Sequence, residues 1–139
     1  MSSTYKRKIN YYETDKMGVV HHSNYIRFLE EARCDWLEKE GIPMSLLEEN
    51  GFTIPTLEVN CKYKTHVTSG DTILITPKVE EYNGVRMKVS YEVIEAKTKR
   101  TVIEAYTKHC FTNKELRPIN MKKNNEKIDS IVQKLLEEN

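Results

Sequence analysis

Residues 12–25 place a carboxylate a short distance before the expected start of a helix, and these two features together could carry out acyl transfer. Asp15 follows an alternating, strand-like segment, and Gly18 permits a tight bend after it. Ser23 and Asn24 can cap the helix, whose first backbone N–H groups are unpaired and lie at the positive end of its dipole. Such donors stabilise a carbonyl oxygen as it becomes negative, while a carboxylate attacks the carbonyl carbon or activates water.

The residues around this bend also have simpler roles. Aspartate is common in turns, so Asp15 could serve only to stabilise the bend. We interpret Glu13, a second nearby carboxylate, as structural. His21 and His22 are adjacent, and no third ligand follows at the spacing of a zinc site, so we expect no metal. The side chain of His22 could instead orient a substrate or form a hydrogen bond with Asp15.

Two further residues at the start of the helix have alternative interpretations. Asn24 is either a helix cap or an amide that orients a bound substrate. Tyr25 either belongs to the core or contacts the substrate, since it begins the apolar stripe of the helix.

Charge and cysteine content argue against several classes of function. The 139 residues include 22 Lys and Arg and 21 Asp and Glu, so a net charge of +1 gives no bulk attraction to nucleic acid or anionic membranes. Cys34, Cys61 and Cys110 form no CxxC pair, which predicts neither a disulfide framework nor a thiolate metal site. No apolar stretch suits a signal peptide or a membrane span, and we expect a cytoplasmic protein.

Periodicity predicts the elements that must position these residues. Residues 4–12 alternate as a strand, and residues 23–40 have the apolar spacing of a long helix that Gly41 and Pro43 end. A short helix follows over residues 44–49. The apolar stripe of the long helix consists of Tyr25, Phe28, Leu29, Ala32 and Trp36.

The middle of the chain predicts an antiparallel sheet. Residues 57–64 and 72–82 read as strands, and Asn83-Gly84 is a strong hairpin signal between two alternating segments. Residues 85–93 and 101–112 give two more strands. Four consecutive strands joined by tight turns imply an antiparallel sheet, and the long helix is its natural cover, which makes the fold α+β.

The C-terminal segment, residues 121–139, differs from the main domain, which we assign to residues 1–120. Residues 121–127 are polar and predict a linker and a helix cap. The apolar residues after them have helical spacing, and a helix this short is marginal alone. We therefore expect it to dock, and we favour docking on its own sheet over docking on a neighbouring subunit.

The pattern Tyr-x-Glu-Thr-Asp-x-x-Gly-Val-Val-x-His-x-Asn-Tyr in residues 11–25, followed by a long helix and four strands, resembles the hot-dog-fold acyl-CoA thioesterases. It is most similar to the branch named for 4-hydroxybenzoyl-CoA thioesterase, which also holds the Tol-Pal-associated thioesterases. The resemblance covers roughly residues 5–119, including residues 62–71 and 113–119.

This resemblance implies a sheet wrapped around a central helix and two chains paired edge to edge, with active sites at the dimer interface. It implies a homodimer or homotetramer that hydrolyses an acyl-CoA thioester without a cofactor. The family's catalytic aspartate matches Asp15, as nucleophile or general base. The backbone amide that polarises the thioester carbonyl matches His22.

A coenzyme A substrate needs cations for its phosphates. Arg86 and Lys88 share one face of the strand after the hairpin turn, and we name them as candidate phosphate contacts. A solvated sheet face is the alternative for this pair. Alternatives for the whole protein are a non-catalytic acyl-CoA-binding module of the same fold, an acyl carrier protein thioesterase, and a dehydratase that would use His22.

Overall fold

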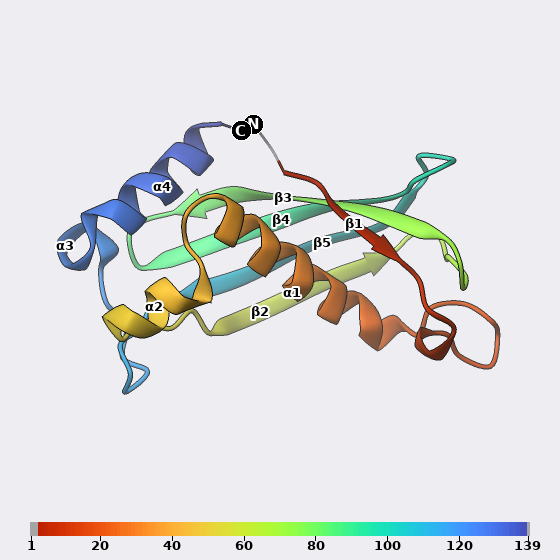
Figure 1. Cartoon of the computed structure of the whole chain (residues 1–139), viewed down its shortest axis with the longest axis horizontal. Helices are drawn as coiled ribbons and strands as arrows, with labels where there is room; N and C mark the ends of the chain where they lie inside the picture. Colours follow the sequence, from red (N-terminus) through yellow and green to blue (C-terminus); the bar gives the residue numbers. More distant parts are fainter. Residues whose placement is uncertain (1–2, 139) are drawn as a thin grey trace.

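A curved, five-stranded antiparallel sheet wraps around one long helix in this computed structural model, which describes residues 3–138 (Figure 1). The order of the strands across the sheet is β1-β3-β4-β5-β2. The strands are β1 (Tyr5–Lys8), β2 (Thr56–Tyr63), β3 (Thr72–Tyr82), β4 (Arg86–Glu95) and β5 (Thr101–Cys110). The α+β class expected from the sequence is confirmed.

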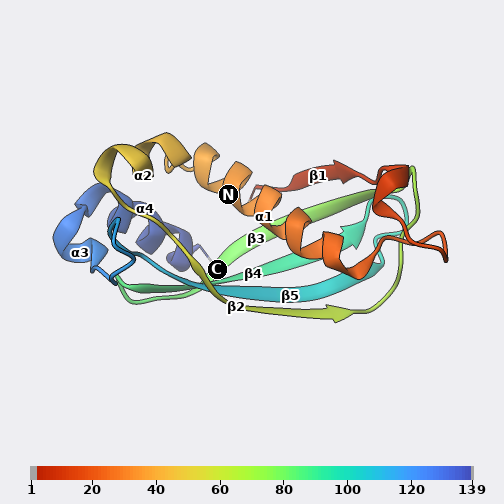
Figure 2. The ribbon, with the colours of Figure 1, turned by 90° about the horizontal axis from the view of Figure 1, so that it is seen from below.

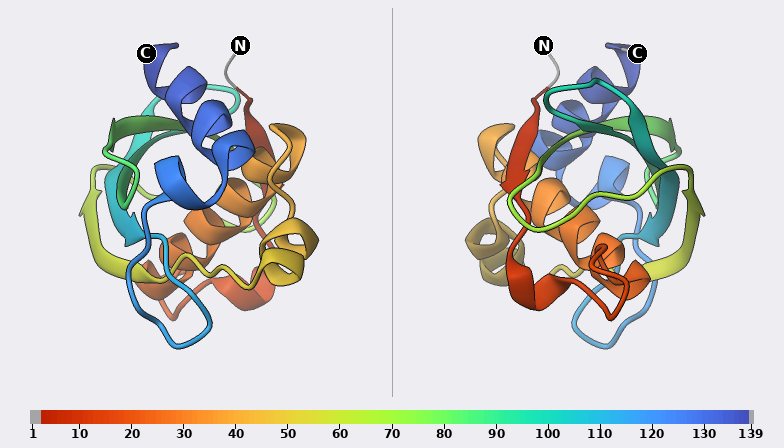
Figure 3. Two further views of the ribbon diagram at one scale, coloured as in Figure 1. Left: turned by 90° about the vertical axis from the view of Figure 1, so that its left-hand side faces the viewer. Right: turned by 90° about the vertical axis from the view of Figure 1, so that its right-hand side faces the viewer.

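The helices lie on the concave side of this sheet (Figures 2 and 3). They are α1 (His22–Lys39), α2 (Met44–Asn50), α3 (Met121–Asn124) and α4 (Glu126–Glu137), and a 3-10 helix, η1, spans Tyr11–Glu13. None of the helices in residues 3–138 is long and apolar enough to cross a membrane.

Helix α1 forms where its apolar period predicts it, because that period places one stripe of large side chains against the sheet. Phe28, Leu29 and Trp36 are each at most 2% exposed. Full burial of one such side chain contributes about 1.5–3 kcal/mol, so this stripe holds α1 in place. The helix begins one residue earlier than expected, at His22.

The strand order differs from a simple succession of hairpins. The Asn83-Gly84 hairpin is confirmed: β3 and β4 pair through it, and Asn83 Oδ1 accepts hydrogen bonds from the backbone N–H groups of Val85 at 2.9 Å and Arg86 at 2.7 Å. However, β2 pairs with β5, at the opposite edge from β1. Residues 64–71 therefore cross from one edge of the sheet towards the other instead of forming a tight turn.

The first and last strands are shorter than expected. The strand expected over residues 4–12 ends at Lys8, because the chain then turns into η1. The strand expected over residues 101–112 ends at Cys110.

The C-terminal helix docks on its own sheet, as expected. Ile128 and Val132 of α4 are fully buried in the same cluster as the side chains of the sheet. The hydroxyl of Tyr82 in β3 donates a hydrogen bond of 2.6 Å to Asp129 Oδ1 in α4. The segment expected to be a polar linker contains α3, whose Met121 is fully buried, so these residues also contribute to the core.

A chain of hydrogen-bonded polar side chains runs from the half-buried Arg33 to the buried Tyr91, Thr107 and His109. The Arg33 guanidinium donates a hydrogen bond of 3.1 Å to the Tyr91 hydroxyl, which lies 2.6 Å from Thr107 Oγ1. Thr107 Oγ1 in turn lies 2.7 Å from His109 Nε2. Burial, followed by the nearby charge of Arg33, lowers the pKa of His109 to about 4, so its ring is neutral at physiological pH.

The neutral His109 predicts a loss of stability in mild acid. Its pKa is about 4 in the folded chain against an ordinary value of 6.5, so the unfolded chain binds the proton more readily. The contribution of His109 to the free energy of unfolding is fully present above pH 6.5 and is lost as the pH falls towards 4. We expect the wild type to lose about 3 kcal/mol more than His109→Gln over this range, measured by urea unfolding.

A matched control is His66→Gln, because His66 is exposed. This variant should keep the pH dependence of the wild type. Equal acid sensitivity of the wild type and His109→Gln would contradict the assignment.

Candidate active site

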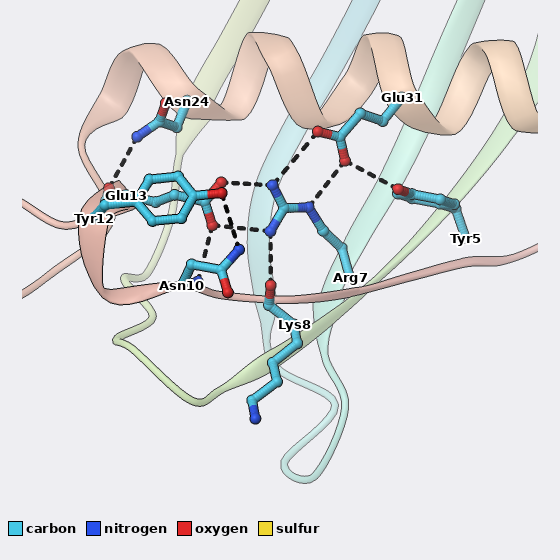
Figure 4. A network of polar contacts seen from close by, with 8 residues as sticks. All are labelled: Tyr5, Arg7, Lys8, Asn10, Tyr12, Glu13, Asn24 and Glu31. Carbon is cyan, nitrogen blue, oxygen red and sulfur yellow. Dashed lines mark hydrogen bonds and ion pairs between the residues drawn. The ribbon is translucent and has the colours of Figure 1, made fainter.

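Arg7 connects three elements at the end of the molecule where α1 begins (Figure 4). Its Nη1 and Nη2 atoms donate to the two carboxylate oxygens of Glu13 at 2.9 and 2.5 Å, and its Nε donates to Glu31 Oε1 at 2.9 Å. The guanidinium also lies 4.6 Å from the centroid of the Phe28 ring. The hydrogen bond to Glu31 is the largest cause that raises the pKa of Arg7, so this cation joins β1, η1 and α1 permanently.

Glu13 transmits this restraint to the start of α1. Its side chain is buried, and its Oε1 also accepts a hydrogen bond from the backbone N–H of Asn10 at 2.9 Å. Its backbone carbonyl accepts from His21 N and from Asn24 Nδ2, both at 2.9 Å. These contacts support the interpretation of Glu13 as structural, and they commit the amide nitrogen of Asn24 to a structural role.

Asp15 begins a tight turn and keeps one carboxylate oxygen free. Its backbone N–H donates to Val19 O at 2.8 Å, its carbonyl accepts from Gly18 N at 3.0 Å, and its Oδ1 accepts from Met17 N at 2.8 Å. Gly18 has a φ of 79°, which a residue with a side chain adopts only with strain. Asp15 therefore does stabilise the bend, which is the simpler role considered for it above. Within residues 3–138, Oδ2 has no hydrogen-bond partner and is available for chemistry.

The N-terminus of α1 presents an unpaired donor close to this turn. The cap is His21 rather than the expected Ser23 or Asn24, and its Nδ1 accepts from Ser23 N at 3.2 Å. The backbone N–H of Asn24 donates to His21 O at 2.9 Å. Among the first three N–H groups of α1, that of His22 is the one with no acceptor in the described part of the chain.

Asp15 and His22 line the same cavity, whose volume is about 310 Å³. The Tyr63 hydroxyl donates a hydrogen bond of 3.3 Å to His22 O, and the Tyr63 ring centroid lies 5.7 Å from that of Tyr25. Burial raises the pKa of Tyr25 to about 12, so its hydroxyl stays protonated at physiological pH. The residues that line the cavity are Asp15, Met17, Val19, Val20, His22, Tyr25, Tyr63, Lys64, Thr65 and His66.

The structure brings together some of the expected site residues and separates others. Asp15, His22 and Tyr25 share the cavity, and Tyr25 also belongs to the core. Asn24 is not among its lining residues. Arg86 and Lys88 line a different cavity of about 320 Å³, so within one chain they do not contact a ligand bound at Asp15.

The wall formed by residues 63–66 was not identified from the sequence as part of the site. The sequence did contain an indication of their role, because these residues fall inside the segment 62–71 that carries part of the family resemblance. Their position became visible only once the crossing from β2 to β3 placed them against the start of α1, where Val20 N donates to Val67 O at 3.0 Å.

Comparisons with known proteins agree with this fold. The model of the thioesterase-like superfamily matches residues 9–136. A protein of Aquifex aeolicus that bears the provisional name of an esterase is 37% identical over 110 residues, which cover 79% of this chain and 84% of that protein. A Bacillus subtilis protein provisionally named an acyl-CoA thioesterase is 27% identical over 116 residues, or 84% of each chain. The DHNA-CoA thioesterase structure from Staphylococcus aureus superposes with a TM-score of 0.90 at 26% identity, covering 96% of this chain and 89% of that one.

The contacts of Arg7 predict that this residue supports the whole site. Arg7→Met leaves the buried carboxylate of Glu13 without its cation, and we expect a loss of about 3 kcal/mol or more in the free energy of unfolding. Glu31→Gln should cost less than about 1 kcal/mol, because the side chain of Glu31 is 37% exposed. Urea unfolding of both variants measures the difference, and equal losses would contradict this role for Arg7.

Proposed function

Because this chain belongs to the thioesterase-like superfamily of thioester hydrolases and has the hot-dog fold, we propose that it hydrolyses acyl-CoA thioesters in the cavity lined by Asp15 and His22. The observation that carries the proposal is that two residues with unpaired polar groups line one cavity. Asp15 and His22 both line it, and in the described residues neither Asp15 Oδ2 nor the backbone N–H of His22 has a hydrogen-bond partner. A carboxylate and an oxyanion donor are the minimal groups that acyl transfer from a thioester requires.

In the proposed reaction, the thioester carbonyl oxygen accepts a hydrogen bond from the His22 N–H and becomes negative as the carbonyl carbon is attacked. Asp15 either takes a proton from the attacking water or attacks directly to give a mixed anhydride that water then opens. In both routes the carbon–sulfur bond breaks and a proton passes to the coenzyme A thiolate. Water is the second substrate, and no step needs a cofactor.

The names of related proteins support a coenzyme A thioester as the substrate. One relative is named an acyl-CoA thioesterase, and a solved neighbour is a DHNA-CoA thioesterase. We also propose that the chain belongs to the branch named for 4-hydroxybenzoyl-CoA thioesterase, on the basis of the motif in residues 11–25. An acyl carrier protein thioester and a non-catalytic binding role remain alternatives, and a coenzyme A thioester assay separates them from our proposal.

Asp15→Asn is the sharpest variant for testing this function. Asparagine keeps an oxygen that can accept the Met17 N–H, so the turn is preserved while the carboxylate is lost. We expect thiol release from short aliphatic and aromatic acyl-CoAs to fall at least about 100-fold, within the range for loss of a general base. The measurement is colorimetric detection of free thiol.

Asp71→Asn is the matched control. Asp71 Oδ2 accepts a hydrogen bond from Thr68 N at 2.9 Å in a comparable turn, but Asp71 does not line the cavity. This control should retain the activity of the wild type. Full activity in Asp15→Asn would transfer the catalytic role to another group, and a wild type that is inactive on every coenzyme A thioester would favour a binding role or a carrier protein substrate.

We further propose that two chains pair through β2 to form a continuous sheet. β2 lies at an edge of the sheet, so one side of its backbone lacks a strand partner within the chain. Its large apolar side chains are unusually accessible: Leu57 and Tyr63 are each 50% exposed, and Val59 is 37% exposed. An exposed apolar edge of this kind favours pairing with a second copy.

Such a dimer would also give Arg86 and Lys88 a role. In an antiparallel pairing of two β2 strands, the start of one strand lies beside the end of the other. Leu57, near the start of β2, shares a cavity with Arg86 and Lys88, and Tyr63, at its end, lines the cavity of Asp15. The proposed phosphate contacts of one chain would then approach the substrate bound in the other.

Val59→Lys tests this arrangement. Two lysines brought together near a two-fold axis repel each other, and we expect the variant to be monomeric at concentrations at which the wild type is a dimer. Sedimentation velocity measures the state of both proteins. Lys62→Ala is the control, because Lys62 is an exposed polar side chain of the same strand. A wild type that sediments as a monomer would contradict the proposal.

A further inference from the structure

A second cavity, larger and more apolar than that of Asp15, lies between α1, α2 and the segment before β2. Its volume is about 450 Å³, within the range of small-molecule sites in proteins. Its apolar walls include Leu37, Ile42, Leu47, Phe52 and Ile54. It shares no lining residue with the cavity of Asp15.

One cation lies in the wall of this apolar cavity. Arg33 is half-buried, and within the described residues its guanidinium forms no ion pair. One of its five N–H donors is used by Tyr91, which leaves the others available to a ligand. Glu30, Glu38 and Glu48 also line the cavity, but all three are exposed and none pairs with Arg33.

The buried polar chain holds this cation in a fixed orientation. Arginine can only donate, so the Tyr91 oxygen accepts from Arg33 and its hydrogen is free to point towards Thr107. The Thr107 hydroxyl lies 2.7 Å from His109 Nε2, and His109 Nδ1 lies 3.4 Å from Thr56 Oγ1. These contacts connect Arg33, in one wall of the cavity, to Thr56, which follows the lining residue Pro55.

A fixed guanidinium without a carboxylate partner, set in an apolar wall, is complementary to one class of ligand. We propose that this cavity binds an amphipathic carboxylate, with its hydrocarbon or aromatic body against the apolar walls and its carboxylate on Arg33. Arginine binds carboxylates with paired hydrogen bonds, and these strengthen where water is excluded. The site does not depend on the proposed hydrolysis, although a carboxylic acid is also the product class of that reaction.

This site is distinct from the catalytic cavity of the same chain. Arg33 follows His22 by 11 residues in α1, so the two lie about 16 Å apart along the helix axis. A carboxylate bound at Arg33 therefore does not contact Asp15 of its own chain.

Cys34 provides a readout that is independent of catalysis, because it lines the cavity and is exposed. Decanoate serves as the test ligand, and decanol serves as an uncharged analogue of the same chain length. We expect decanoate to slow the alkylation of Cys34 by iodoacetamide at least fivefold in the full chain, and decanol to have a much smaller effect. Peptide mass spectrometry follows Cys34, with the buried Cys110 as an internal check of folding.

Two variants assign the effect. Arg33→Met should abolish the preference for decanoate over decanol, while Arg27→Met, which removes an exposed arginine of the same helix, should keep it. Arg33→Lys retains the charge and should retain part of the preference even if Arg33→Met unfolds. Asp15→Asn should leave the protection unchanged, so a failure of the proposed hydrolysis would not be mistaken for a failure of this site.

Three outcomes would overturn the proposal. Equal protection by decanoate and decanol would remove the role of Arg33, and no protection by either would show that the cavity does not bind this class of ligand. Protection of Cys34 without any ligand, increasing with protein concentration, would show that a second copy of the chain covers the cavity instead.

Discussion

The ion pairs and hydrogen bonds of Arg7 are the interactions on which the geometry of the cavity lined by Asp15 and His22 depends. Two carboxylates from different elements, Glu13 and Glu31, compete for one guanidinium, and both are satisfied because its planar fork offers donors on several sides. Removing Arg7 would leave the buried carboxylate of Glu13 without its cation, whereas removing the more exposed Glu31 leaves the Arg7–Glu13 pair intact. This requirement fixes η1 against α1, and it therefore fixes the distance between the turn of Asp15 and the amide of His22.

Helix α1 lines both cavities, and it contributes a different kind of group to each. At its N-terminus the unpaired N–H of His22 is a consequence of helical geometry and would exist for any residue other than proline at that position. At its middle the helix contributes a side chain, Arg33, whose orientation depends on Tyr91 in β4. The first site is therefore robust to substitution at His22, while the second depends on the identity of several buried residues.

Much of the local structure could be predicted from the sequence. The period of α1, the Asn83-Gly84 hairpin and the C-terminal helix are all found as expected, because each depends on residues close in the chain. The strand order was not predicted, since nothing local indicates that β2 pairs with β5 rather than β3. The role of His21 as the cap was missed as well, because histidine is an uncommon cap and Ser23 with Asn24 offered a stronger local signal.

By itself, the sequence determined which side chains could carry chemistry and which elements would present them. Asp15, Gly18 and the start of α1 stand within a few residues of one another, so their proximity is a local property. Only the tertiary structure decided that Tyr63 lines the same cavity, that Arg86 and Lys88 line a different one, and that Arg33 lines an apolar cavity without a carboxylate partner among the described residues. The physical reason is that these relationships depend on strand pairing and helix packing between segments far apart in the chain, which local periodicity does not encode.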